Sequence, residues 1–129
     1  MSPTVATAIS ACLAAAPSFE HLDSTVEKLG FKEAGRENQD VRWTDIQGTE
    51  VFLSSVPRQM VCSVWFDGSA TDETASLSEL LQNHGYAARR LTDDQSGPLW
   101  LVGANWFVRL VVKQGNEHRL GAALFVLRN

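Results

Sequence analysis

The chain has 129 residues, of which 44% are hydrophobic and 20% are charged, and its formal net charge is −4. This length fits one compact domain, and the composition is that of a globular protein rather than a disordered chain. The acidic balance argues against nucleic acid as a partner, because phosphate binding requires a concentrated basic face. We therefore expect a single domain over residues 1–129 that binds no nucleic acid.

Residues 1–16 form the first predicted helix. Ser2 is a suitable N-cap, Pro3 suits the first turn, and apolar residues recur on one face. The segment ends in alanines that resemble a signal-peptide cleavage site, but no Lys or Arg precedes its apolar run. The run is also too weakly hydrophobic for a signal peptide or a membrane span. Without a clear signal peptide we expect no membrane span and a cytoplasmic location.

A first unit of a helix and three strands is predicted over residues 18–67. Its helix covers 18–30 and ends at Gly30, which suits the cap that follows a helix. Alternating apolar residues and intervening turn residues then predict three strands. These strands are 39–46, 50–56 and 60–67.

A second unit of the same kind is predicted over residues 72–127. Its helix covers 72–84, with Gly85 in the capping position. Its strands are 86–92 continued by 99–103, then 105–113, and finally 118–127. An offset of 55 residues aligns the two units, for example Leu22 with Leu77 and Phe52 with Phe107. The pattern predicts an α+β domain with two layers, in which the duplicated αβββ unit forms one mostly antiparallel sheet of about six strands.

This order of elements resembles that of small bacterial secretion chaperones. No sequence motif accompanies the resemblance, which lies in the succession of a helix and three strands in each unit. The resemblance implies a two-layer domain that binds another protein.

Strands 60–67, 105–113 and 118–127 are apolar on both faces, which predicts central strands that are covered on both sides. Helices cover one side of such a sheet, and several arrangements remain for the other. In one arrangement the N-terminal helix crosses to the far side, and in another the sheet curls on itself. In the others, a second copy of the chain packs there, or a hydrophobic ligand or peptide binds there.

Cys12 and Cys62 are the two cysteines, and both lie on faces assigned to the core. They form either one disulfide or two buried thiols. A disulfide would indicate an oxidising compartment, the periplasm or the outside of the cell, in place of the cytoplasm.

Catalytic and metal-binding motifs are not found. The three histidines show no metal-ligand spacing, and there is no G-x-S-x-G elbow, phosphate-binding glycine loop or dinucleotide fingerprint. We therefore expect a protein that is not an enzyme and holds no cofactor or metal.

Aromatic side chains in the predicted strands are the candidates for an interaction face. These are Trp43, Trp65, Phe107 and Phe125. The sequence favours a non-enzymatic protein-interaction or adaptor module, chaperone-like or inhibitor-like, that binds a protein partner or itself through a strand edge or a sheet face. The alternative is a domain that binds a small molecule or lipid in an apolar cavity between helices and sheet.

Overall fold

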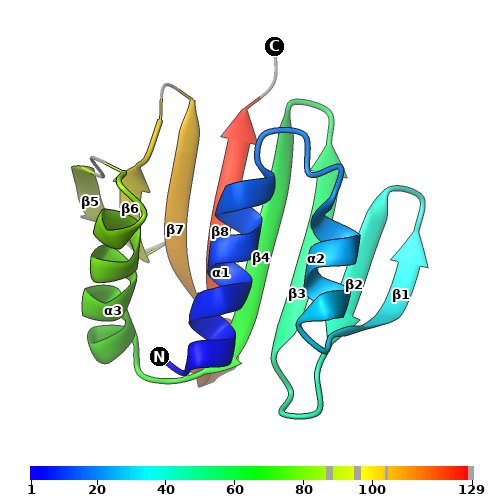
Figure 1. Ribbon diagram of the computed structural model, residues 1–129. Coiled ribbons are helices and arrows are strands. Elements are labelled where there is room, and N and C mark those ends of the chain that lie inside the picture. Colours follow the sequence, from blue (N-terminus) through cyan, green and yellow to red (C-terminus); the bar gives the residue numbers. More distant parts are fainter. Residues whose placement is uncertain (87–88, 95–96, 104, 128–129) are drawn as a thin grey trace.

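The structure, a computed structural model, describes residues 1–86, 89–94, 97–103 and 105–127. In this part of the chain three helices lie on one side of a single antiparallel sheet of eight strands (Figure 1), so the class is α+β as expected. The helices are α1 (Pro3–Ala15), α2 (Leu22–Lys28) and α3 (Ala70–Asn83). The strands are β1 (Lys32–Glu37), β2 (Asp40–Thr44), β3 (Glu50–Val56), β4 (Gln59–Asp67), β5 (Arg89–Asp94), β6 (Gly97–Leu101), β7 (Trp106–Lys113) and β8 (Asn116–Leu127).

The strands follow the order β1-β2-β3-β4-β8-β7-β6-β5, and every neighbouring pair is antiparallel. The first half of the chain therefore builds one half of the sheet and the second half builds the other. They meet where β4 pairs with β8 along nine residue pairs, from Gln59–Leu127 to Asp67–Arg119. Strands β4, β8 and β7 lie inside the sheet, as their doubly apolar sequences predict.

The predicted number of strands is wrong, because the described residues form eight strands rather than about six. Strand β1 was missed since it lies at the edge of the sheet with all six residues exposed, so no buried face imposes an alternating pattern. The segments 86–92 and 99–103, predicted as one interrupted strand, correspond to the paired strands β5 and β6. Each of α2 and α3 is followed by four strands, and the predicted αβββ unit is not matched.

Helix α1 confirms the predicted N-terminal helix. The Ser2 hydroxyl accepts a hydrogen bond from the Val5 amide at 3.2 Å, and Pro3 occupies the first turn. The helix lies between α2 and α3, over the middle of the sheet (Figure 1). It therefore shares the side of the other helices and does not cross to the far side.

Cys12 of α1 and Cys62 of β4 form a disulfide with their Cα atoms 5.8 Å apart, so of the two alternatives left open by the sequence, the structure shows the bridge. Both residues are buried, with 2% and 0% of their surface exposed. Leu22, Leu77 and Leu81, from α2 and α3, are also fully buried against the sheet. The bridge thus fastens α1 to an interior strand within the core that the helices and the sheet enclose.

Candidate functional site

The side of the sheet that faces away from the helices is the candidate site, and we call it the open face. Because Cys62 faces α1 and side chains alternate along a strand, Val61, Ser63 and Trp65 point to the open face. No helix of the described residues lies on it (Figure 1). Its partly exposed apolar residues are Phe52, Val61, Trp65, Leu99, Leu101, Phe107, Val111 and Phe125.

Three of the four aromatic residues predicted for an interaction face lie on the open face. Phe107 and Phe125 are cross-strand partners on β7 and β8, and Trp65 lies on β4. Trp43 does not join them, because it points to the helix-covered side and is only 1% exposed. Its polar neighbours suggested an exposed position, but Arg42 instead takes the open side, since adjacent residues of a strand face opposite ways.

Trp65 is held flat on the sheet by two neighbours. Its indole N–H donates a hydrogen bond to the Ser63 hydroxyl at 3.1 Å. Its ring covers Gly121, the cross-strand partner on β8, where an added Cβ would lie 2.7–2.8 Å from three ring atoms. Only glycine at this position leaves room for the ring, so Gly121 sets the orientation of Trp65.

We expect Gly121→Ala to lift the Trp65 ring from the sheet, because the new methyl group and the ring cannot occupy the same space. The expected cost is roughly 1–3 kcal/mol of unfolding free energy, with a red-shifted tryptophan emission as the ring enters water. Urea unfolding and fluorescence measure both effects. The control is the same substitution in a Trp65→Ala background, where the penalty should largely disappear; an equal penalty there would contradict the proposed contact.

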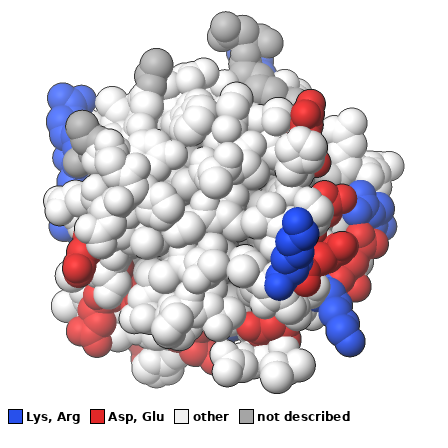
Figure 2. Space-filling model, viewed as in Figure 1, with Lys and Arg blue, Asp and Glu red and all other residues white. Residues whose placement is uncertain are grey.

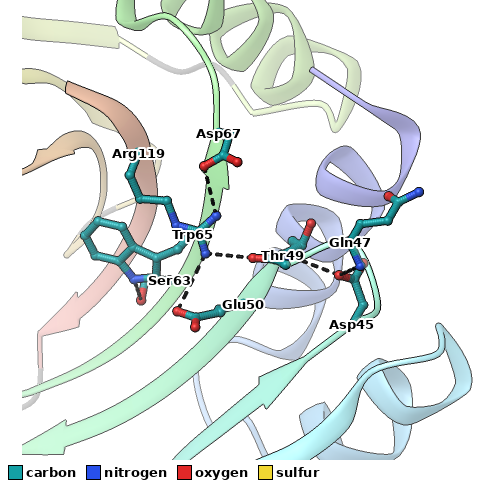
Figure 3. A network of polar contacts seen from close by, with 9 residues as sticks. Asp45, Gln47, Thr49, Glu50, Ser63, Trp65, Asp67 and Arg119 are labelled. Atoms are coloured by element: carbon teal, nitrogen blue, oxygen red, sulfur yellow. Dashed lines mark hydrogen bonds and ion pairs between the residues drawn. The ribbon is translucent and has the colours of Figure 1, made fainter. Parts of the chain in front are cut away.

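Arg119 organises the polar edge of the open face (Figure 3). Its Nη2 donates to the Gly48 carbonyl at 2.7 Å, and its Nη1 donates to Asp67 Oδ1 at 3.3 Å. Glu50 Oε2 lies 3.7 Å from Nη2. With 15% of its side chain exposed, the guanidinium is held between two carboxylates and the carbonyl of a turn.

The turn that Arg119 holds connects β2 to β3 and presents an apolar side chain to solvent. Asp45 Oδ1 accepts from the amides of Gln47 and Thr49, both at 2.9 Å, and Gly48 has the positive φ of +86° that the turn requires. Ile46, at the tip, is 101% exposed. The open face is thus bordered by an ordered turn with a fully exposed aliphatic residue.

The open face is hollowed beside Trp65. This hollow has a volume of about 320 Å³, and its lining residues are Arg42, Glu50, Phe52, Trp65, Lys113 and Arg119. A second hollow of about 360 Å³ adjoins it and shares Arg42 and Phe52. The cations of this site were not identified from the sequence, because they lie on different strands and only the register of the sheet brings them together.

The helix-covered side offers less room for a ligand in its interior. The space between α1 and the sheet, beside the disulfide, measures about 10 Å³. An open hollow of about 620 Å³ lies at the surface along α3 and β6, where its lining is mostly small or polar. Figure 2 shows this side, with uncharged side chains over its middle and charged ones towards its margins.

The described residues include one contact between a serine and a histidine. Ser10 Oγ of α1 lies 2.7 Å from Nε2 of His84, the residue that caps the C-terminus of α3. In the described part of the chain no carboxylate bonds to this imidazole, so the contact joins two helices at the surface without the third member of a triad. The described histidines, cysteines and acidic residues likewise form no group of three or more that could hold a metal ion.

No protein-family model matches the chain, and neither a curated protein nor a solved structure shows significant similarity to it. Among the described residues, no helix has both the length and the apolar character needed to cross a membrane.

Proposed function

We propose that this protein is a non-enzymatic interaction module that binds a protein partner through the open face. The observation that carries this proposal is the set of partly exposed aromatic side chains, Trp65, Phe107 and Phe125, on a sheet face that no described helix covers. Contiguous exposed apolar surface marks binding sites, and buried aromatic residues contribute much of the energy of protein interfaces.

The sheet face is favoured over the strand edge as the contact surface. Edge strand β1 is fully exposed and charged, and its pairing with β2 is interrupted between Glu33 and Gly35. Glu33 accepts hydrogen bonds from Arg36, which raises the pKa of that guanidinium above its usual value. Charges and bulges at an edge oppose the addition of another strand. Strand addition at β1 is therefore disfavoured, and we place the partner on the face.

The alternative, a small molecule or lipid in an apolar cavity between helices and sheet, has less support. Ligand pockets typically measure about 300–1,000 Å³, whereas the space beneath α1 is about 10 Å³. The larger hollow along α3 opens to solvent and contains no Trp or Phe among its lining residues. The disulfide supports an oxidising compartment as the place where the module acts.

A selection from random peptides displayed on phage tests this proposal. We expect to select peptides that bind the wild-type protein. The same peptides should bind the Trp65→Ser/Phe107→Ser variant about tenfold or more weakly, because these rings supply the apolar contact. The matched control is Leu29→Ser/Val112→Ser, which removes two partly exposed apolar residues that lie off the open face and should leave binding unchanged. Unfolding curves verify that both variants fold.

Two outcomes would overturn the proposal: no enriched peptide, or peptides that both variants bind as well as the wild type does. Light scattering adds the self-associated case. A particle of twice the 14.2 kDa chain mass that the Trp65→Ser/Phe107→Ser variant dissociates would identify a second copy as the partner.

A further inference from the structure

The hollow beside Trp65 carries an excess of positive charge in a chain whose net charge is −4. Three of its six lining residues are cations and one is an acid, Glu50. The charge of Arg119 is offset by Glu50 and Asp67. The remaining excess comes from Arg42 and Lys113, which are exposed and have no acceptor within the described part of the chain.

The floor of the same hollow is apolar and preorganised. Phe52 and Trp65 form it, and the Trp65 ring is fixed by its hydrogen bond to Ser63 and by its contact with Gly121. A fixed surface loses little conformational entropy when a partner binds. The hollow thus offers an ordered aromatic surface next to two cations.

The adjoining hollows are long enough for a peptide. Together their lining residues come from β1, β2, β3 and β4 and continue to β8 and β7. Six neighbouring strands, from β1 to β7, span roughly 24 Å at about 4.8 Å between strands, the length of about seven extended residues. The second hollow is lined by two cations, Arg36 and Arg42, and two acids, Glu37 and Asp40, so it adds no further excess of positive charge.

We propose that the groove formed by these two adjoining hollows binds an acidic segment of the partner protein. Acidic side chains of the segment face Arg42 at one end and Lys113 at the other, and an apolar side chain between them packs on Phe52 and Trp65. This inference rests on the proposed function and names the chemistry of the partner: opposite charge aids encounter and excludes basic segments.

Arrays of degenerate nine-residue peptides test the inference. Three pools carry Glu-Leu, Gln-Leu or Lys-Leu at the centre and mixed residues elsewhere. We expect the wild-type protein to retain roughly fivefold more of the Glu-Leu pool than of the Gln-Leu pool, which is the upper range for one exposed ion pair. The Lys-Leu pool should be retained least. The preference should weaken as added salt screens these charges.

Arg42→Gln/Lys113→Gln should abolish the preference for Glu-Leu. The matched control is Lys28→Gln/Arg58→Gln, which removes the same charge from exposed positions outside both hollows and should preserve it. Equal retention of the Glu-Leu and Gln-Leu pools, or the same loss of preference in both double variants, would overturn the inference while open-face binding stands. If the Trp65→Ser/Phe107→Ser variant retains every pool as well as the wild type does, the proposed function fails together with this inference.

Discussion

Removal of the disulfide by Cys12→Ala/Cys62→Ala is expected to lower the free energy of unfolding by about 4 kcal/mol. The bridge joins residues 50 positions apart and so restricts the unfolded chain along more than a third of its length. It also fastens α1 to β4, and both cysteines are buried in the core. A loss of this size is a large part of the stability of a small domain.

Urea unfolding of the wild-type protein with and without reductant, alongside the double variant, measures this effect. The reduced wild type and the double variant should unfold at similar urea concentrations, both well below the oxidised protein. The slopes of the transitions need separate inspection, because loss of the bridge also enlarges the unfolded ensemble. Coincident curves for the oxidised and reduced proteins would contradict a stabilising bridge.

Trp43→Ala is expected to cost about 3–5 kcal/mol of unfolding free energy, because it empties a large volume inside the core. Trp43 is among the largest side chains that are almost completely buried, and only 1% of its surface is exposed. On the sequence-based interpretation as an interaction residue, the same substitution would leave stability nearly unchanged. Urea unfolding therefore distinguishes a buried Trp43 from a Trp43 exposed on an interaction face.

Trp43→Phe is the matched control for that measurement. The indole N–H of Trp43 is buried and finds no acceptor among the described residues. Phenylalanine keeps most of the apolar volume and removes this unpaired donor, so we expect a cost below about 1.5 kcal/mol. A large loss with Phe would show that the indole N–H has a partner and that shape alone does not explain the site. A loss below 1 kcal/mol with Ala, at the level of an average surface substitution, would contradict burial itself.

The orientation of the interior strands could be predicted from the sequence. In β4, Cys62 and Val64 face the helices while Val61 and Trp65 face the other way, because side chains alternate with a period of two whatever the strand pairs with. The same rule separated the two faces of β7 and β8, but only the register of the sheet made Phe107 and Phe125 cross-strand partners. The helical period assigned Cys12 to the buried face of α1 in the same way, and the structure joins it to Cys62.

Strand β1 and the true position of Trp43 could not be predicted in this way. An edge strand with no buried face has no apolar period, so its charged sequence resembled a loop. For Trp43, alternation distinguished two faces of β2 but not which of them the helices cover. That choice depends on where α2 and the neighbouring strands pack, which is a property of the whole layer.

The sequence by itself determined the α+β class, the two-sided apolar strands and the residues able to form the disulfide, since these follow from periodicities within short segments. Only the tertiary structure decided that α1 joins the other helices on one side and leaves the open face exposed. Only the tertiary structure, likewise, brought Arg119 to the Gly48 carbonyl, 71 residues away, and placed Arg119 beside Trp65. The physical reason is that strand order and register, which bring distant segments together, depend on the packing energy of the complete sheet and not on any local pattern.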